Sequence, residues 1–397
     1  MSLDEAALVA DVRARLFAHS SSALTIGAEV ELIPVVAATK APAPILSSAG
    51  SSSVEMIRWA GRGRGWDETP SASGAPSWSL PDGSRLSFEP GGQIEISSRP
   101  HQSCSSLVTS LQETVSLLTA SADENGMELL SVGVDPFNDI DAVPLQLDGD
   151  RYVMMTHYLN ARGESGIRMM RQTAALQISV EHGPKPNERW ALLNALAPYI
   201  VAIFANSSRY AGCDTGHASY RAHLWRKLDR SRTGIPFDKD DPALRYAEFA
   251  LDAGALRGDR RRGEFKAFRW MLADSELRPE DWQFHLSTLF PEIRPKEYFE
   301  IRSADTIGAG DLIAPLAFVA GLVYDERSAI AALDVLGAPD EDLLRCAGQE
   351  GLGNAKIKSR AAQLVHLSAE GALRLPTDYI TPRHRTQAAA WLAWRMG

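Results

Sequence analysis

Cysteine is scarce in this chain of 397 residues, which contains Cys104, Cys213 and Cys346 and no others. Because these three are far apart and odd in number, they predict neither a disulfide framework nor a CxxC metal site. The sequence also lacks an apolar run of the roughly 20 residues that a membrane helix needs, and an N-terminal basic segment followed by an apolar run. We therefore expect a reduced, cytoplasmic protein that does not bind membranes.

The chain also has no excess of positive charge, because it contains 41 basic and 50 acidic residues and its net charge is -9. A general nucleic-acid binder has the opposite balance, so we expect no nucleic-acid partner. The GxxxxGK[ST] loop, the HExxH motif and the GxSxG elbow are absent, and GRGRG at 61–65 lacks the preceding strand and the spacing of a dinucleotide fingerprint. Nucleotide-binding P-loops, zinc peptidases and serine hydrolases are thereby disfavoured.

Strand-like and helix-like segments follow one another without regular alternation, which favours an α+β fold with a mainly antiparallel sheet. From residue 308 onward the pattern predicts helices alone, and residues 61–84 predict a long irregular surface loop. Strands are expected at 23–36, in two short pieces within 85–98, at 170–181 and at 296–303.

Two of these predicted strand regions are acidic. Glu29 and Glu31 in TIGAEVEL share one strand face, and Gln93 and Glu95 in FEPGGQIEIS share another, with Glu89 just before the Pro-Gly-Gly turn. Carboxylates on one face repel each other unless water or a cation separates them, and such oxygen ligands suit Mg²⁺ or Mn²⁺. From the residues alone, two solvated strand faces remain the alternative.

Three further segments place polar residues on one face. In the stretch 169–181, one side of the predicted strand carries Arg171, Thr173, Gln177, Ser179 and Glu181. The stretch 219–234 is basic and contains Arg221, Trp225 and Arg232. In the stretch 298–305, Glu300 and Arg302 share a face. Arginine suits phosphate and carboxylate oxygens, which it can bind with two parallel hydrogen bonds. A plain solvent-facing role is the alternative for each segment.

These five segments, in this order, resemble the glutamate–cysteine ligases of plants and many proteobacteria and the related ligase of ergothioneine biosynthesis. The matching stretches lie within roughly residues 20–326; they are TIGAEVEL, FEPGGQIEIS, Met-Met-x-x-Thr-x-x-x-Gln at 169–177, SYRAHLW, SRTG, HLSTLFPEIRPKEYFEIRSAD at 285–305 and AFVAGLVYDE at 317–326. The resemblance implies a curved antiparallel sheet of the glutamine-synthetase type, backed by helices. It further implies a catalytic domain over 1–326 and a helical C-terminal extension over 327–397 packed on it.

The activity implied by the resemblance is a ligation that depends on ATP and Mg²⁺, with Mn²⁺ as a substitute, through a γ-glutamyl phosphate that the amine of cysteine then takes up. The implied metal ligands are Glu29, Glu31, Glu89, Gln93 and Glu95. The implied substrate-binding residues are Thr173, Gln177, Arg221 and Trp225, and the implied catalytic residues are Arg232, Glu300 and Arg302. The expected partners are therefore small molecules.

The sequence departs from the plant pattern in ways that leave the acceptor amine open. Gln172 stands where the plant enzymes carry an arginine, and Arg171 lies one residue earlier, on the opposite face of the predicted strand. Lys227 replaces an acidic residue, and the plant regulatory cysteines have no evident counterpart. A ligase of the same family that joins glutamate or another carboxylate to a different amine is the first alternative. A non-catalytic nucleotide-binding paralogue is the second, which the presence of all four glutamates disfavours.

Overall fold

The computed structural model describes residues 4–19, 24–47, 50–256, 265–273 and 277–397, so residue 23 of the first predicted strand lies outside it. In this part of the chain, nine strands form one sheet in the order β10-β11-β7-β1-β5-β4-β3-β2, with β6 paired to β1. Each of these pairings is antiparallel, which confirms the predicted fold class. The sheet strands are β1 (Ile26–Val36), β2 (Asp67–Thr69), β3 (Ser77–Ser79), β4 (Arg85–Phe88), β5 (Ile94–Ser97), β6 (Met127–Leu130), β7 (Ala175–Val180), β10 (Ile293–Pro295) and β11 (Phe299–Asp305).

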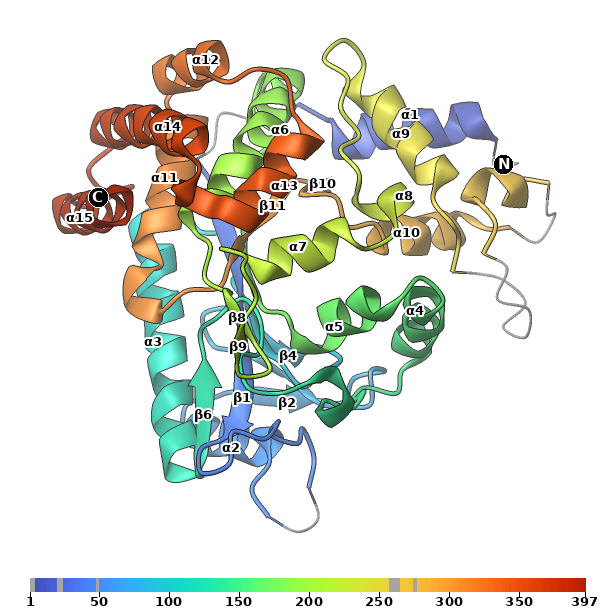
Figure 1. The fold of residues 1–397 in the computed structure, drawn as a ribbon, viewed down its shortest axis with the longest axis vertical. Helices are drawn as coiled ribbons and strands as arrows, with labels where there is room; N and C mark the ends of the chain where they lie inside the picture. The colour runs from blue at the N-terminus through green and yellow to red at the C-terminus, as the bar shows by residue number, and fades with distance from the viewer. Residues whose placement is uncertain (1–3, 20–23, 48–49, 257–264, 274–276) are drawn as a thin grey trace.

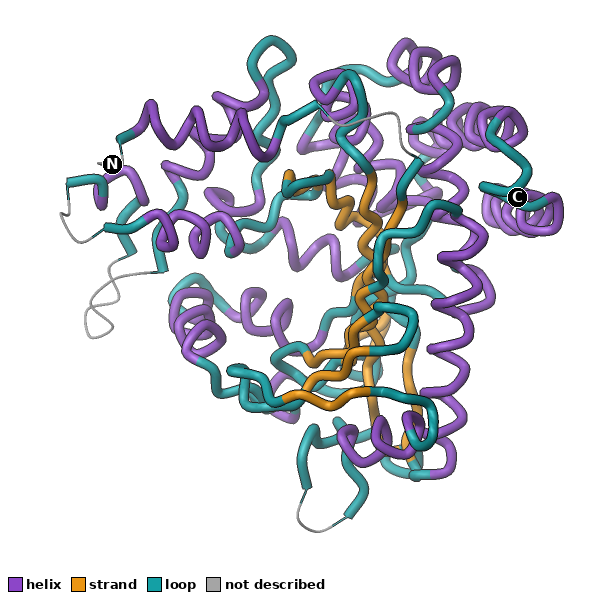
Figure 2. Tube along the Cα trace, turned by 180° about the vertical axis from the view of Figure 1, so that it is seen from behind, coloured by secondary structure: helices purple, strands orange, loops and turns teal. Residues whose placement is uncertain are grey.

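Helices surround this sheet on both sides (Figures 1 and 2). A separate short hairpin of β8 (Arg209–Tyr210) and β9 (Cys213–Asp214) lies beside them. The helices are α1 (Glu5–Leu16), α2 (Ser53–Gly61), α3 (Cys104–Glu124), α4 (Asp150–Asn160), α5 (Glu164–Gln172), α6 (Pro186–Ile203), α7 (Tyr220–Arg226), α8 (Arg230–Thr233), α9 (Pro242–Asp252), α10 (Pro279–Ser287), α11 (Ile313–Val323), α12 (Glu326–Val335), α13 (Glu341–Glu350), α14 (Ala355–Arg374) and α15 (Pro382–Met396).

Strand β1 lies at the centre of the fold because it pairs with three other strands. Its first half pairs with β5 and β7, and its second half pairs with β6. Alternate residues point to opposite faces of a strand, so Ala28, Val30 and Leu32 are buried together on one face while Glu29 and Glu31 share the other. The apolar face therefore belongs to the core, and the acidic face is free to form a site.

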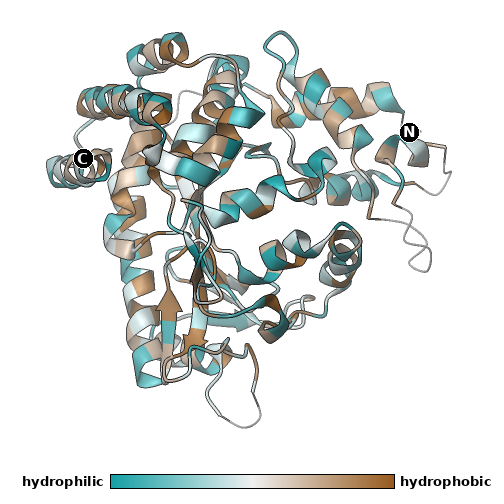
Figure 3. Cartoon of the chain, viewed as in Figure 1, coloured by the Kyte–Doolittle hydropathy of each residue, from teal (hydrophilic) through white to brown (hydrophobic). Residues whose placement is uncertain are grey.

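The apolar face of the sheet is covered by helices that lie on one side of it in Figure 1. Helix α3 contacts β1 and β6, α6 contacts β11 and β10, and α11 packs against both α3 and α6. All eleven residues of α11 are buried, and the helix is mostly brown in the hydropathy colouring of Figure 3. Among the residues that the structure describes, no helix is long and apolar enough to cross a membrane.

The C-terminal helices α12, α14 and α15 pack against α11, and they belong to the same core. Helices α11 and α14 approach each other most closely at two glycines. A Cβ atom at Gly371 would lie 2.0 Å from the backbone oxygen of Gly321, and a Cβ at Gly321 would lie 2.2 Å from the backbone oxygen of Ser368. This packing agrees with helices from residue 308 onward, while the division into domains at residue 326 stays a prediction.

Replacing Gly371 by alanine is expected to lower the free energy of unfolding by about 1–3 kcal/mol or more, because the added methyl group forces two packed helices apart. Urea unfolding monitored by circular dichroism measures this change. Gly337→Ala is the matched control, since no neighbouring atom lies within 4 Å of a Cβ there, and its effect should stay within about 0.5 kcal/mol. Equal stability of the two variants would contradict the close helix packing.

Two sequence predictions are wrong in detail. The segment 170–181 does not form one strand, because Arg171 and Gln172 end helix α5 and β7 begins only at Ala175. These two side chains therefore do not lie on opposite faces of a strand. The Arg171 guanidinium donates to the backbone oxygen of Val143 at 3.1 Å, and the Gln172 amide donates to that of Asn138 at 2.8 Å.

The predicted irregular loop at 61–84 is also only partly irregular. It contains β2 and β3, which extend the sheet beyond β4. Trp78 on β3 is buried and packs edge-on against Phe88, with ring centroids 6.0 Å apart. Short strands of this kind depend on tertiary contacts, so turn-forming composition alone conceals them.

Candidate active site

The acidic face of the sheet forms the floor of a cavity of about 130 Å³. The helices α4, α5 and α7 and the segment that leads into β10 supply its other walls. The lining residues are Glu29, Glu31, Glu89, Pro90, Gln93, Glu95, Arg151, Tyr152, Met155, Met169, Met170, Thr173, Ala175, Gln177, Arg221, Trp225, Phe290, Arg294 and Arg302. Ten of the twelve predicted site residues are among them.

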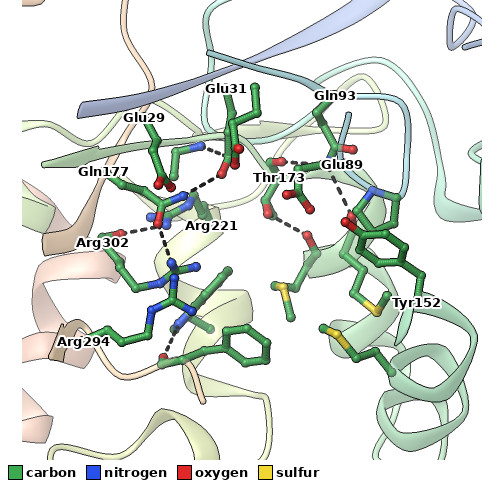
Figure 4. Close-up of a pocket in the computed structure, with 18 of the residues that line it drawn as sticks. Glu29, Glu31, Glu89, Gln93, Tyr152, Thr173, Gln177, Arg221, Arg294 and Arg302 are labelled. Atoms are coloured by element: carbon green, nitrogen blue, oxygen red, sulfur yellow. Dashed lines mark hydrogen bonds between the residues drawn. The ribbon is translucent and has the colours of Figure 1, made fainter. Parts of the chain in front are cut away.

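Strand register brings the two acidic segments together. Glu31 of β1 lies directly opposite Glu95 of β5, and Glu29 lies opposite Gln177 of β7. Glu89 directly follows β4, just before the turn that joins β4 to β5. Its side chain reaches the same cavity (Figure 4). Carboxylates from two separate sequence segments thus converge on one cavity. The sequence of either segment alone does not predict this.

The turn at Pro90-Gly91-Gly92 requires both glycines, for different reasons. Gly92 has a φ of +98°, a backbone region that side chains with a Cβ rarely adopt. Gly91 passes so close to α5 that a Cβ there would lie 1.9 Å from the backbone oxygen of Arg171. The turn is therefore held against the end of α5, which fixes Glu89 at the rim of the cavity.

The glutamates of this cavity resist ionisation. Burial, followed by repulsion from Glu300 and Glu95, raises the pKa of Glu29 to about 7. Burial is likewise the main cause of raised pKa values for Glu31, Glu89 and Glu95, and neighbouring carboxylates add to it in each case. Such shifts indicate that the protein alone does not neutralise the negative charge gathered here.

Protein donors hold two of these carboxylates in position. Glu31 accepts hydrogen bonds from the backbone nitrogen of Ala175 at 2.7 Å and from the amide of Gln177 at 3.0 Å. Glu95 accepts from the hydroxyl groups of Ser87 at 3.1 Å and Ser97 at 2.9 Å. Each of these carboxylates keeps lone pairs for a further partner.

Basic residues gather around Glu300 beside the acidic floor. Arg294 lies opposite Glu300 in the β10–β11 hairpin and contacts it at 2.7 Å, Arg302 contacts it at 2.8 Å, and Lys296 also forms an ion pair with it. Burial opposes ionisation of Glu300, but the charges of these three cations outweigh it and hold its pKa far below the usual range. Glu300 is fully buried and does not line the cavity, and its ion pairs position Arg294 and Arg302, which do line it.

Arg302 connects the basic and acidic parts of the site. A β-bulge between Ile301 and Ala304 interrupts the pairing of β11 with β7 at this point. The Arg302 guanidinium donates to the side-chain oxygen of Gln177, whose amide donates in turn to Glu31. Bulges re-aim side chains next to active sites, and this one directs an arginine toward the acidic floor.

Helix α7 contributes Arg221 and Trp225. Arg221 is buried, donates to the backbone oxygen of Arg302 at 2.7 Å, and has Asp305 as an ion-pair partner at 3.8 Å. Asp305 is held by the backbone nitrogen of Asn206 at 2.7 Å and by the hydroxyl groups of Ser207 and Ser219. Figure 4 shows Arg221 and Arg302 on the side of the cavity where Glu29 and Glu31 lie.

Three predicted site residues have protein partners that alter their expected roles. The side-chain oxygen of Gln93 accepts from the backbone nitrogen of Gly91 at 2.9 Å, and its amide donates to the backbone oxygen of Thr173 at 2.8 Å, so Gln93 fastens the turn, and its role as a metal ligand stays a prediction. The Thr173 hydroxyl donates to the backbone oxygen of Met169 at 2.6 Å. Arg232 does not line the cavity; it is buried against Tyr158, Thr288 and Gly254, which corrects the expectation that it reaches phosphate.

Motif analysis missed Arg151, Arg294 and Lys296 and the apolar wall. That wall joins the predicted Trp225 to Met155, Met169, Met170 and Phe290, which were not predicted as site residues. Arg294 could have been found, because Glu-Ile-Arg at 292–294 repeats the Glu-Ile-Arg at 300–302 that supplied the predicted Glu300 and Arg302. Arg151 had no such signal, since a single arginine at a helix start is common.

The four carboxylates suit a hard divalent cation, although their present arrangement does not form a complete cage. Among the described residues, no group of three or more acidic, histidine or cysteine side chains is placed to hold one ion. Mg²⁺ at nucleotide sites usually binds one or two carboxylates and completes its shell with phosphate oxygens and water. The donor set, the burial and the raised pKa values therefore fit cations that arrive with a phosphate ligand.

Without cation or nucleotide, the free energy of unfolding should fall by about 1–3 kcal/mol between about pH 5 and pH 7 because of Glu29. The unfolded chain ionises Glu29 near its ordinary pKa, whereas the folded chain keeps the proton until the pH approaches the raised pKa of about 7. Stability contributed in this way is lost as the pH rises. Urea titrations of the wild type and Glu29→Gln across this range isolate the effect, and equal slopes for the two proteins would contradict it.

Comparisons with known proteins point to one family. The family model described as glutamate–cysteine ligase family 2 matches residues 25–373. The glutamate–cysteine ligase EgtA of Mycolicibacterium smegmatis is 32% identical over 324 residues, which cover 77% of this chain and 75% of that protein. The chloroplastic glutamate–cysteine ligase of Arabidopsis thaliana is 32% identical over 326 residues, which cover 76% of this chain but 61% of the plant protein.

A solved structure supports the fold. The crystal structure of a glutamate–cysteine ligase from Francisella tularensis in complex with AMP superposes with a TM-score of 0.53 at 12% identity. The match covers 93% of this chain and 82% of that chain. At so low an identity, the likeness establishes shared architecture.

Proposed function

This chain belongs to glutamate–cysteine ligase family 2, and from that premise we propose that it joins the γ-carboxylate of glutamate to the amine of cysteine while ATP is converted into ADP and phosphate. Its relatives are carbon–nitrogen ligases, and this chain is an enzyme of that class. The observation that carries the proposal is the cavity in which four glutamates, Glu31 buried and the other three half-buried, face a cluster of arginines.

The reaction needs both kinds of charge in one place. A γ-carboxylate oxygen attacks the γ-phosphorus of ATP and the bond to ADP breaks; the amine then attacks the acyl carbon, loses a proton, and the bond to phosphate breaks. Glu29, Glu31, Glu89 and Glu95 would hold Mg²⁺ or Mn²⁺, which when bound screens the repulsion between phosphate and carboxylate oxygens. The residues of this chain do little covalent chemistry, and their main work is positioning.

The arginines would bind the anionic groups of the substrates. The Nε atoms of Arg221, Arg294 and Arg302 are buried and have no hydrogen-bond acceptor among the described residues. The Nε atoms of Arg226 and Arg232, which do not line the cavity, are in the same state, so the position of the three arginines in the cavity wall is what supports this role. Carboxylate and phosphate oxygens are the acceptors that match guanidinium groups best.

The apolar wall of the cavity indicates which kind of acceptor amine the site favours. Met155, Met169 and Met170 place three thioether groups next to Trp225 and Phe290 in one small cluster. Such a polarisable surface suits a thiol or another small apolar side chain and disfavours a charged one. Cysteine is therefore the acceptor that we propose, and a different small amine remains the second candidate.

The test is an assay with ATP, Mg²⁺, glutamate and cysteine in which ADP and the dipeptide are both measured. We expect stoichiometric formation of ADP and γ-glutamylcysteine, with none when Mg²⁺ is omitted. Turnover with another amine from a panel, but not with cysteine, would keep the enzyme class and remove the substrate assignment. Binding of ATP without ADP formation for any amine would favour a non-catalytic paralogue.

We infer a reducing compartment, the cytoplasm, as the place of action. Cys104, Cys213 and Cys346 are all free thiols. Burial raises the pKa of the Cys104 thiol to about 12, so it is inert rather than redox-active. Some relatives are named as chloroplastic enzymes, and localisation of a tagged full-length protein by fluorescence microscopy tests the inference.

A further inference from the structure

Helix α7, which contributes two side chains to the cavity, is attached at its start to the C-terminal helix α13. The backbone nitrogens of Ala218 and Ser219, just before α7, donate to the backbone oxygens of Gln349 and Gly348, both at 2.9 Å. The last carbonyl groups of a helix have no partner within it, so the chain that enters α7 supplies partners for two of those in α13. Figure 1 shows the two helices next to each other.

Two glycines allow this close approach. A Cβ atom at Gly348 would lie 3.1 Å from the Cβ of Ala222 in α7. Gly351, just after α13, has a φ of +55°, and a Cβ there would lie 2.7 Å from the Cβ of Ala218. Both distances are shorter than the roughly 3.5–4.0 Å at which carbon atoms pack without repulsion. A methyl group added to α13 at this contact must therefore displace α7.

The position of α13 is itself fixed by the core. Helix α13 packs on α6, and α6 packs against β10 and β11 of the sheet. Leu344 and Ala347 of α13 are buried in the main hydrophobic core. At its other end, Glu341 forms an ion pair with Arg230 of α8 at 2.6 Å. The distance of α7 from the sheet is thus set through α13 and α6.

A displacement of α7 reaches the cavity through two side chains. The Arg221 guanidinium donates to the backbone oxygen of Arg302 at 2.7 Å, and the Trp225 indole nitrogen donates to that of Phe290 at 2.9 Å. Ala222 lies between these two residues in a helix of seven residues, so they move with it. Hydrogen bonds hold only over a narrow range of distance and angle, and a shift of α7 therefore disturbs both side chains.

We propose that Gly348 is a positioning residue for the active site. Through its contact with Ala222, it lets α13 set where α7 holds Arg221 and Trp225, and thereby sets the affinity for the substrate that α7 binds. This inference rests on the proposed function, in which these two side chains meet a substrate. The predicted catalytic domain over 1–326 would then be incomplete without a helix from the predicted C-terminal extension.

The test is a double-mutant cycle of Gly348→Ala and Ala222→Gly, in which the second substitution removes the methyl group that the first one meets. The KM and kcat are measured for ATP, glutamate and cysteine, and binding of ATP and glutamate is measured by calorimetry. In Gly348→Ala we expect the KM of one substrate to rise by roughly 3- to 10-fold, with a smaller change in kcat, because a misplaced α7 weakens binding throughout the reaction. Arg221→Lys should raise the KM of the same substrate.

The double variant separates positioning from stability. Its KM should return to within about twofold of the wild type, because the methyl group has moved from one helix to the other and the contact regains its size. Its resistance to urea should stay below that of the wild type, since glycine in a helix interior is unfavourable. Ala222→Val, which enlarges the same contact from the side of α7, should raise the same KM as Gly348→Ala.

Gly371→Ala is the matched control, because it presses α11 and α14 apart away from the cavity. It should lower stability without changing any KM. Unchanged KM and binding constants in Gly348→Ala, a rise that Ala222→Gly does not reverse, or an equal rise in Gly371→Ala would each overturn the proposal. Absence of turnover in the wild type, with ATP or glutamate binding that follows the cycle, would count against the proposed function alone.

Discussion

Glu95→Gln is expected to reduce turnover by about 10²- to 10³-fold while leaving the fold intact. Glu95 lies opposite Glu31 at the centre of the acidic floor, and the substitution keeps its shape and removes its charge. The loss should appear mainly in kcat, because charge is redistributed most during phosphoryl transfer. Steady-state kinetics with saturating ATP measures it, and a raised Mg²⁺ requirement should accompany it.

The matched control for this prediction is Glu128→Gln. Glu128 lies on β6 of the same sheet and forms an ion pair with Lys40 away from the cavity. An exposed pair of this kind is worth at most about 1 kcal/mol, so the control should keep normal turnover. If Glu95→Gln were as active as this control, the acidic floor would merely face water.

Glu300→Gln is expected to lower the free energy of unfolding by about 3–5 kcal/mol, the largest effect on stability that we predict. Glu300 is the buried anion between Arg294, Lys296 and Arg302, and its removal leaves three cations without their main counter-charge. Urea unfolding measures the loss. Glu297→Gln in the same hairpin region should change stability by only about 0.5 kcal/mol.

The pH dependence of this difference follows from the depressed pKa of Glu300. A carboxylate whose pKa is lowered by folding stabilises the folded state fully above its ordinary pKa, and the contribution is lost as the pH falls through the folded value. The wild type and Glu300→Gln should therefore differ most near neutral pH and converge in acid. A difference that grew on acidification would contradict the role given to Glu300.

The sequence predicted the acidic parts of the site because strand periodicity determines which side chains share a face. Glu29 with Glu31 and Gln93 with Glu95 could be placed in pairs on that ground alone. The pairing of β1 with β5 and β7 could not be predicted in this way, because strand register depends on contacts between segments that are far apart in the chain. Family resemblance supplied the missing link between the two acidic segments.

Other features were hidden for equally physical reasons. The polar alternation of 170–181 is typical of a strand, but helix α5 continues to Gln172. The end of this helix packs against the turn at Gly91, a contact that the local sequence does not reveal. Arg232 lies in a basic segment that predicted phosphate binding. Its guanidinium instead donates hydrogen bonds to the backbone oxygens of Thr288 and Gly254. Composition identifies an arginine, but whether it meets a ligand or the backbone is decided by the fold.

One measurement tests the central claim most directly: the anomalous scattering of Mn²⁺ in a crystal of this enzyme grown with a non-hydrolysable ATP analogue. We predict manganese peaks about 2.0–2.3 Å from oxygens of at least two of Glu29, Glu31, Glu89 and Glu95, with nucleotide phosphate oxygens completing the shell. Manganese bound to the nucleotide elsewhere, with these four side chains left without a cation, would contradict the account.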